Sequence, residues 1–305
     1  MHAHAHEHGH SHHHHAPPAG GDWRYGAAIA LNLAFVAAEA TAGVLANSTA
    51  LLADAGHNLS DVLGLTLAGG AAWLARRRAG PQRTYGYGKA TVLAALANGL
   101  ILVAACAAIG WEALRRLAEP APVASTTVMA VAAIGVAINA GTAMLFMRGR
   151  HDDINARGAY LHMMADAAVS AAVIVAGALI FFTGLNWIDS ALSVAVVALI
   201  LWGAWGLLRD ALDLSLDAAP PHIDVAAVRA HLAGLPGVTA VHDLHVWAMR
   251  ADAPALTAHL VRPQGGDDAF LRGAAEELAH RFGIGHVTLQ IEQDARAECA
   301  GCSDP

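Results

Sequence analysis

Charged residues are scarce in this chain. Among its 305 residues, Asp, Glu, Lys and Arg together make up 14%, whereas hydrophobic residues make up 56%. Soluble domains usually carry about 25% charged residues, so the composition indicates a membrane protein. Lysine is nearly absent, since Lys89 is the only one against 17 arginines.

A basic excess is missing as well. Residues 1–210 hold 12 basic and 12 acidic side chains, whereas residues 211–305 hold 6 basic and 13 acidic ones. The net charge of −7 therefore lies in the last third of the chain. Without a basic patch to neutralise phosphates, we expect no nucleic-acid partner.

Cysteine is also rare, and three residues do not make a disulfide framework. Cys106 lies in an apolar run and is expected to be a small core residue. Cys299 and Cys302 form a CxxC near the C-terminus. Two interpretations of this motif remain open, a reduced disordered tail and a part of a metal site.

Long apolar runs, in contrast, are abundant. A bilayer core about 30 Å thick needs about 20 apolar residues per helix. Six stretches are long enough: 23–46, 49–75, 89–117, 124–147, 156–183 and 187–209. The sequence therefore predicts a transmembrane domain of six helices over residues 23–210.

The arginines indicate the orientation of these helices. They gather in the loops 75–89 and 148–157, whereas the connections near 46–49 and 183–187 carry no charge. The positive-inside rule then places the arginine-bearing loops and both termini in the cytoplasm. We expect a multi-pass protein of the inner (cytoplasmic) membrane.

The pattern changes after the two prolines at 220–221. Helical and strand-like segments then alternate, over 223–234, 238–249, 255–262, 267–282 and 286–293. This α-β-β-α-β order, with antiparallel pairing, predicts a small α+β domain over residues 217–295.

The second apolar stretch contains the polar run "DAGHNLSD" at 54–61, close to the middle of the bilayer. His57 and Asp61 are four residues apart and therefore lie on one helix face. A charged side chain at this depth costs roughly 2.5–3.5 kcal/mol. The polar face must therefore contact protein, water or a cation.

The fifth stretch repeats the spacing, because "HMMAD" contains His162 and Asp166. Two imidazoles and two carboxylates form the tetrahedral set that suits Zn²⁺ at about 2.0–2.2 Å. A structural hydrogen bond between helices is the alternative. The repeated HxxxD, with no other histidine in any of the six stretches, favours a metal site made of His57, Asp61, His162 and Asp166.

Three more polar residues lie in the apolar stretches. For Asp54, support of the metal ligands, proton handling and helix packing remain open, and Asn58, near the same face, is a candidate for ligand support or the proton path. Glu39 in the first stretch is costly enough to bury that it is a candidate for the proton or ion path.

Three segments together resemble the cation diffusion facilitator family: "NSTALLADAGHNLSDVL", "HMMAD" and "VHDLHVW". The resemblance covers residues 23 to 293 and implies a homodimeric six-helix transporter with a ferredoxin-like cytoplasmic domain. Such proteins are not enzymes. They export divalent cations, typically Zn²⁺, in exchange for protons.

The resemblance also assigns residues. His57, Asp61, His162 and Asp166 match the transport-site motif, and the paired HxxxD is similar to the zinc- and cadmium-preferring branch. Manganese members tend to have carboxylates in place of the histidines. The loop 75–89 has neither His nor Asp, so we expect no additional metal site there.

The resemblance further implies regulatory zinc sites in the cytoplasmic domain. The matching residues are His242, His259, His286 and Glu292, joined by His245 and, in the tail 296–305, by Cys299 and Cys302. Gln290 stands where some members have a ligand histidine, which argues against a cluster of two metal ions.

Residues 1–15 hold 9 of the 19 histidines. This composition cannot form a packed core, so residues 1–22 are predicted to be a disordered cytoplasmic tail. We expect the tail to bind metal weakly and to raise its local concentration.

Two other functions were weighed. An intramembrane metallohydrolase would need a motif such as HExxH, which is absent, and Asn58 stands where its glutamate would be. A membrane metal sensor would bind metal without moving it. The complete ligand set in the apolar stretches favours the export of Zn²⁺.

Overall fold

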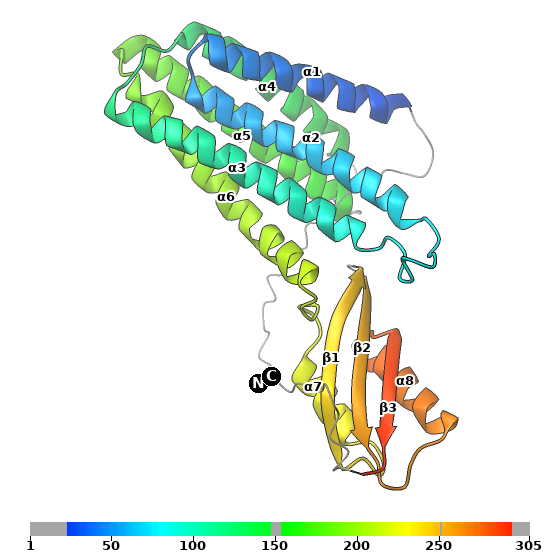
Figure 1. The fold of residues 1–305 in the computed structure, drawn as a ribbon. Coiled ribbons are helices and arrows are strands. Elements are labelled where there is room, and N and C mark those ends of the chain that lie inside the picture. Colours follow the sequence, from blue (N-terminus) through cyan, green and yellow to red (C-terminus); the bar gives the residue numbers. More distant parts are fainter. Residues whose placement is uncertain (1–22, 148–153, 251, 295–305) are drawn as a thin grey trace, which may run out of the picture. The chain divides into compact units, whose positions relative to one another are not determined.

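A computed structural model describes residues 23–147, 154–250 and 252–294 (Figure 1). Its first part consists of six helices: α1 (Trp23–Leu45), α2 (Thr49–Ala75), α3 (Ala90–Ala118), α4 (Ser125–Phe146), α5 (Ile154–Thr183) and α6 (Trp187–Ser215). All six predicted apolar stretches are thus helical. Their ends agree to within two residues, except that α6 continues beyond the predicted residue 209 to Ser215.

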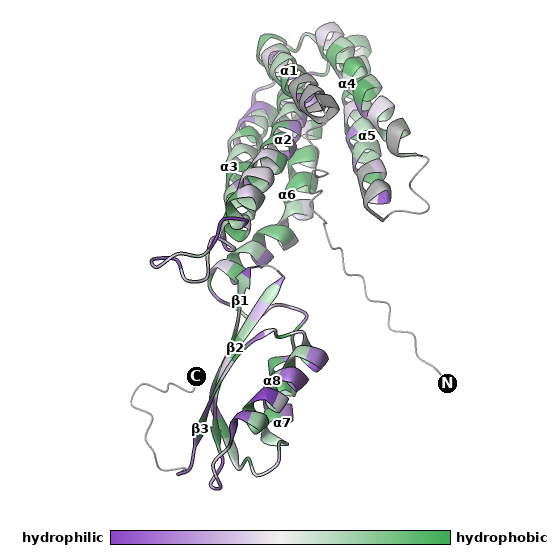
Figure 2. Cartoon of the chain, turned by 90° about the vertical axis from the view of Figure 1, so that its right-hand side faces the viewer, coloured by the Kyte–Doolittle hydropathy of each residue, from purple (hydrophilic) through white to green (hydrophobic). Residues whose placement is uncertain are grey.

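Four of the described helices are long and apolar enough to cross a membrane, namely α3, α6, the segment Ser125–Met144 of α4 and the segment Tyr160–Thr183 of α5. Figure 2 shows hydrophobic residues along most of their length. These helices form a helical membrane domain. In α2 the polar run 54–61 interrupts the apolar sequence, and in α1 only Asn32–Leu45 counts as a shorter apolar helix.

The N-terminus of α2 is held by Asp189, in the first turn of α6. One carboxylate oxygen of Asp189 accepts a hydrogen bond from Ser48 Oγ at 2.5 Å. The other oxygen accepts from the Thr49 backbone N–H at 2.6 Å and from Thr49 Oγ1 at 2.9 Å. A carboxylate at a helix N-terminus satisfies free N–H groups and the helix dipole. This contact fixes the start of the helix that carries His57.

The C-terminal part of the chain is a small α+β domain, as the sequence predicted. Its elements are α7 (Val225–Ala233), β1 (Ala240–Arg250), β2 (Ala253–Val261), α8 (Asp268–Phe282) and β3 (His286–Glu292). Side chains of both helices and of β2 form its core, which includes the fully buried Val228, Leu232, Leu256, Leu260 and Leu278.

The three strands form a sheet in the order β1-β2-β3. β1 and β2 are an antiparallel hairpin, whereas β2 and β3 run parallel. The prediction of antiparallel pairing was therefore wrong for β3. Between β2 and β3 the chain forms α8, and a helical crossover returns the chain to the same end of the sheet, so that the next strand runs parallel.

The described residues fall into two compact units. One contains the residues up to 69 together with 97–208, and the other contains 70–96 together with the residues from 209 onward. His57, Asp61, His162 and Asp166 all belong to the first unit, and the sheet belongs to the second.

Candidate metal sites

Helices α2 and α5 bring the four predicted transport-site residues together. His57 Nε2 lies 3.8 Å from Asp61 Oδ2 and 3.4 Å from Asp166 Oδ1. His162 Nε2 lies 3.3 Å from Asp61 Oδ2 and 3.6 Å from Asp166 Oδ2. Each imidazole thus contacts both carboxylates. We call these four residues the helix quartet.

The spacing within the helix quartet suits a small cation. In a tetrahedral site with bonds of about 2.0–2.1 Å, neighbouring ligand atoms lie about 3.3–3.4 Å apart. The four His–Asp distances of 3.3 to 3.8 Å are close to this value. His57, Asp61 and Asp166 have ligand atoms within 4.8 Å of one another, and this group does not include His162. His162 is close to both carboxylates, so a closed tetrahedron requires the two imidazoles to approach each other.

The helix quartet is closed at one end and open at the other. The side chain of Asp166 is 3% exposed, whereas those of Asp61 and His162 are 34% and 44% exposed. A cation bound here would therefore be reached from the side of His162.

A second polar cluster adjoins the quartet. Glu39 of α1 and Asp54 of α2 are both fully buried. Asn58 Nδ2 donates a hydrogen bond to Glu39 Oε2 at 3.2 Å, and Ser170 Oγ donates one to Asp54 Oδ2 at 2.8 Å. The structure thus brings together the three accompanying residues that the sequence singled out, with Ser170 as an addition.

Two residues that position these groups were not predicted from the sequence. Ser170 follows Asp166 by four residues, so the spacing on one helix face could have identified it. Asp189 stands in the first turn of α6, but its partners Ser48 and Thr49 are about 140 residues away, and no local pattern shows this contact.

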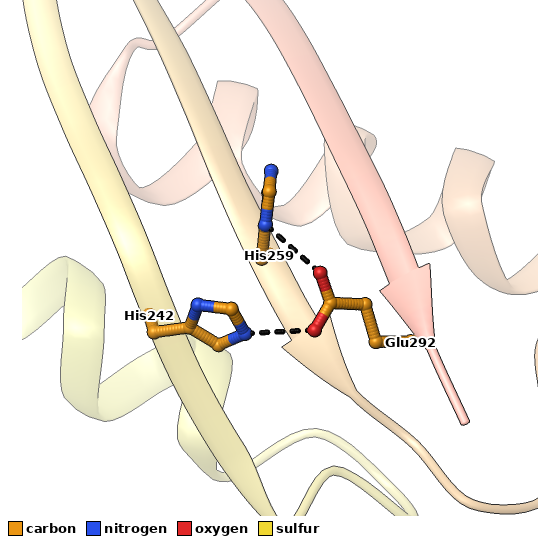
Figure 3. A group of neighbouring side chains, drawn as sticks. All are labelled: His242, His259 and Glu292. Atoms are coloured by element: carbon orange, nitrogen blue, oxygen red, sulfur yellow. Dashed lines mark hydrogen bonds and ion pairs between the residues drawn. The ribbon is translucent and has the colours of Figure 1, made fainter. Parts of the chain in front are cut away.

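In the α+β domain, three of the predicted ligands meet on the sheet (Figure 3). His242 of β1 lies opposite His259 of β2 in the antiparallel register. Glu292 of β3 bridges them, because its Oε2 lies 2.9 Å from His242 Nε2 and its Oε1 lies 3.0 Å from His259 Nδ1. We call these three residues the sheet triad.

His245 lies beside the sheet triad and not within it. Its Nε2 contacts Asp243 Oδ1 at 3.0 Å, and the other oxygen of Asp243 lies 3.6 Å from His259 Nε2. Asp243 has a positive φ of 51°, at an irregularity of the β1–β2 register between His242 and His245. This backbone kink points Asp243 toward both histidines.

His286 is separated from the sheet triad. It pairs with Ala255 at the start of β3, whereas Glu292 pairs with Val261 at its end. Six residues of strand correspond to about 20 Å, so within one chain His286 does not reach the triad. Cys299 and Cys302, like the histidine-rich residues 1–22, lie outside the described residues.

Elsewhere in the described ranges, no further group of three or more His, Cys, Asp or Glu side chains converges closely enough to bind one ion. The two groups that do are the sheet triad and, in the helix quartet, His57 with Asp61 and Asp166.

Two families of known proteins match this chain in succession. The family described as "Cation efflux transmembrane domain" matches residues 27–214, and the one described as "Cation efflux protein, cytoplasmic domain" matches residues 220–294. The boundary between the two matches lies close to the end of α6.

Relatives of similar length share more than a third of the sequence. The cation efflux system protein CzcD of Alcaligenes sp. is 36% identical over 90% of this chain and 88% of its own. The cadmium, cobalt and zinc/H(+)-K(+) antiporter of Bacillus subtilis is 36% identical over 84% of each chain. A solved metal-bound C-terminal domain of a CzcD transporter is 37% identical and covers 23% of this chain and 99% of its own, with a TM-score of 0.20.

Proposed function

Because this chain belongs to the cation efflux, or cation diffusion facilitator, family of membrane transporters, we propose that it exports Zn²⁺ from the cytoplasm in exchange for protons. The helix quartet is the site through which the ion passes. The protein is not an enzyme in this account, because the ion is moved and not transformed.

The observation that carries this proposal is the convergence of two nitrogen and two oxygen ligands from two separate helices. Their spacing is close to that of a tetrahedral site, and Zn²⁺ favours tetrahedral sites of imidazole and carboxylate. Two carboxylates also balance the charge of a divalent cation, which lowers the cost of holding it among apolar helices.

The ligand set does not separate Zn²⁺ from Cd²⁺ by affinity alone. The Bacillus subtilis relative is named for cadmium, cobalt and zinc together. We therefore propose Zn²⁺ as the main substrate and Cd²⁺ as a second one.

Exchange for protons follows from the same ligands. A ligand histidine must be neutral and a ligand carboxylate ionised, so protons compete with the metal for the site. A proton gradient can then release the metal on one side of the membrane and restore the protonated site afterwards. The Bacillus subtilis relative is named a cadmium, cobalt and zinc/H(+)-K(+) antiporter, which supports an exchange of metal for protons.

We further propose that all six helices α1–α6 cross the inner membrane, with both termini in the cytoplasm. The placement of arginine in the loops supports this topology. In this topology the α+β domain is cytoplasmic and ferredoxin-like and joins two chains in a homodimer. Its match to a family of cytoplasmic domains supports this assignment.

The sheet triad favours a second role for Zn²⁺, as a regulatory ligand of the cytoplasmic domain. Two imidazoles and one carboxylate leave one position for a ligand from elsewhere, such as water or a cysteine of the C-terminal tail. If the protein were only a sensor, this site would bind zinc and the helix quartet would not move it.

Transport in sealed proteoliposomes tests the proposal. Purified full-length protein is reconstituted, zinc is added outside, and dyes inside record zinc and pH, with Cd²⁺ and Mn²⁺ as alternative ions. We expect the native protein to exchange zinc and cadmium for protons, and His162→Ala to behave like empty liposomes. Zinc binding without any flux through the native protein would contradict export and leave the sensor role.

A further inference from the structure

Two carboxyl groups lie buried beside the helix quartet without being part of it. Glu39 of α1 and Asp54 of α2 are 0% exposed. One oxygen of each accepts a hydrogen bond, from Asn58 and Ser170 respectively. The other oxygens, Glu39 Oε1 and Asp54 Oδ1, are buried and have no hydrogen-bond partner among the described residues.

The two carboxyl groups are neighbours, because Asn58, which donates to Glu39, follows Asp54 by four residues and so lies on the same face of α2. Two buried carboxylates side by side repel each other, and each loses its hydration. A positive charge between the groups replaces the repulsion by attraction and compensates for the lost hydration. The two oxygens without partners are the atoms that would bind it.

The atoms of this cluster that could bind a cation are oxygens, namely the carboxylate oxygens of Glu39 and Asp54 and the hydroxyl of Ser170, whereas Asn58 faces Glu39 with its amide nitrogen. Such a set suits a hard cation and not the softer ions that prefer imidazole. A proton shared by two carboxyl groups needs no cavity, as in pairs of acidic residues that hold one proton in common. The chemistry thus differs from that of the helix quartet.

The contacts between α2 and α5 show where this pair lies along the helices. Asp61 contacts His162, His57 contacts Asp166, and Asp54 contacts Ser170. Residue numbers fall on α2 as they rise on α5, so the helices are antiparallel. Asp54 lies about 4.5 Å along the axis from His57, toward the loop 46–49 that the proposed topology places outside the cytoplasm.

We propose that Glu39 and Asp54 form a second cation subsite, made only of oxygen ligands, which holds one further proton of the exchange beside those that compete with the metal at the helix quartet. The inference rests on the proposed antiport and adds a second place where a counter-ion binds. A proton from the outer side converts one carboxylate to a carboxylic acid, and its departure toward the cytoplasm restores the carboxylate. The charged groups that face Asp54 from α2 and α5 are His57 and Asp166, and Glu39 faces Asp54 and Asn58.

The test uses the full-length protein in the proteoliposomes described above, with buffers that contain or lack K⁺. Glu39→Gln removes the acid group and keeps the side chain length. Glu112→Gln is the matched control, because Glu112 pairs with Arg115 and Arg116 at the end of α3 and not with the quartet. Zinc binding is measured by calorimetry on the same preparations.

We expect Glu39→Gln to bind zinc like the native protein but to release fewer protons per zinc, and Glu112→Gln to keep the native binding and the native ratio. Glu39→Asp, which restores an acid group, should restore the native number of protons per zinc. If zinc instead drives K⁺ exit and Glu39→Gln abolishes it, the subsite holds an alkali cation, and the assignment of the proton to it is overturned.

If Glu39→Gln still releases the native number of protons per zinc, the subsite is overturned. A variant that loses both zinc binding and exchange would also overturn it, because Glu39 would then be a structural support of the quartet. Should Glu39→Gln not insert, Asp54→Asn is compared in the same way. A native protein that moves no zinc would instead contradict the proposed export, so the two failures are distinguishable.

Discussion

The helix quartet and the sheet triad use the same two kinds of side chain in different ways. In the quartet, each imidazole contacts two carboxylates at 3.3 to 3.8 Å. In the triad, one carboxylate uses both oxygens to contact two imidazoles at 2.9 and 3.0 Å. The first spacing is that of ligands around an ion, and the second is that of direct hydrogen bonds.

This difference fits two different tasks. The quartet offers four ligands, two of them substantially exposed, and its contacts are too long to hold the side chains together tightly. The triad offers three ligands that already satisfy one another. The two arrangements agree with the proposed roles, an ion that passes through the quartet and an ion that binds to the triad at equilibrium.

The largest effect on zinc transport is expected when a ligand of the quartet is removed. Asp166→Asn replaces the most buried carboxylate of the four and leaves the site with less negative charge. We expect the initial rate of zinc uptake by proteoliposomes to fall at least about 100-fold, since even residues that only support a ligand contribute 10–100-fold. Asp213→Asn, at an exposed ion pair of α6, is the control. A rate close to native in Asp166→Asn would remove this residue from the path.

A substitution in the sheet triad should weaken zinc binding there without lowering the rate of zinc transport. Glu292→Gln removes the charge that both histidines contact, and we expect zinc binding at this site to weaken about 10–100-fold. At saturating zinc, transport should continue. Equilibrium dialysis with the full-length protein measures the loss, and an unchanged zinc stoichiometry and affinity would show that the triad binds no metal.

A stability prediction concerns the residue that positions α2. Asp189→Ala removes the acceptor for Ser48 and for Thr49, so buried donors lose their partner. We expect a loss of about 2–4 kcal/mol in the free energy of unfolding in detergent. Thr142→Ala, which removes only a hydrogen bond within one helix, should cost far less. Equal effects would show that Asp189 is not needed to hold α2.

The smallest effect is expected at His286, the matched histidine outside the triad. Because it pairs with Ala255 at the far end of β3, His286→Ala should change the zinc affinity of the triad by less than about twofold. The same dialysis measures it. A loss as large as that of Glu292→Gln would mean that His286 joins the site from a second chain.

Local spacing made the helices and the quartet predictable. Apolar runs of sufficient length marked the helices, and HxxxD placed each His and Asp on one helix face. The sequence could not show how α2 and α5 are aligned. The spacing of four residues from Asp166 puts Ser170 on the same helix face, but its contact with Asp54 of the other helix depends on that alignment.

Long-range pairing was less predictable. The strands were recognised from their alternation, but the direction of β3 depends on the path of α8 across the sheet. His286 was grouped with Glu292 because the family resemblance implied both as ligands, although the two residues lie at opposite ends of one strand. Strand identity follows from local pattern, whereas the meeting of side chains across a sheet depends on register.

The central claim is tested most directly by the same substitution, histidine to alanine, in the helix quartet and in the sheet triad. Zinc-driven proton exit is measured in proteoliposomes that contain either His57→Ala or His242→Ala, beside the native protein. The account predicts that His57→Ala is indistinguishable from empty liposomes, while His242→Ala retains exchange at saturating zinc. Native exchange by His57→Ala would contradict the claim that the ion passes through the helix quartet.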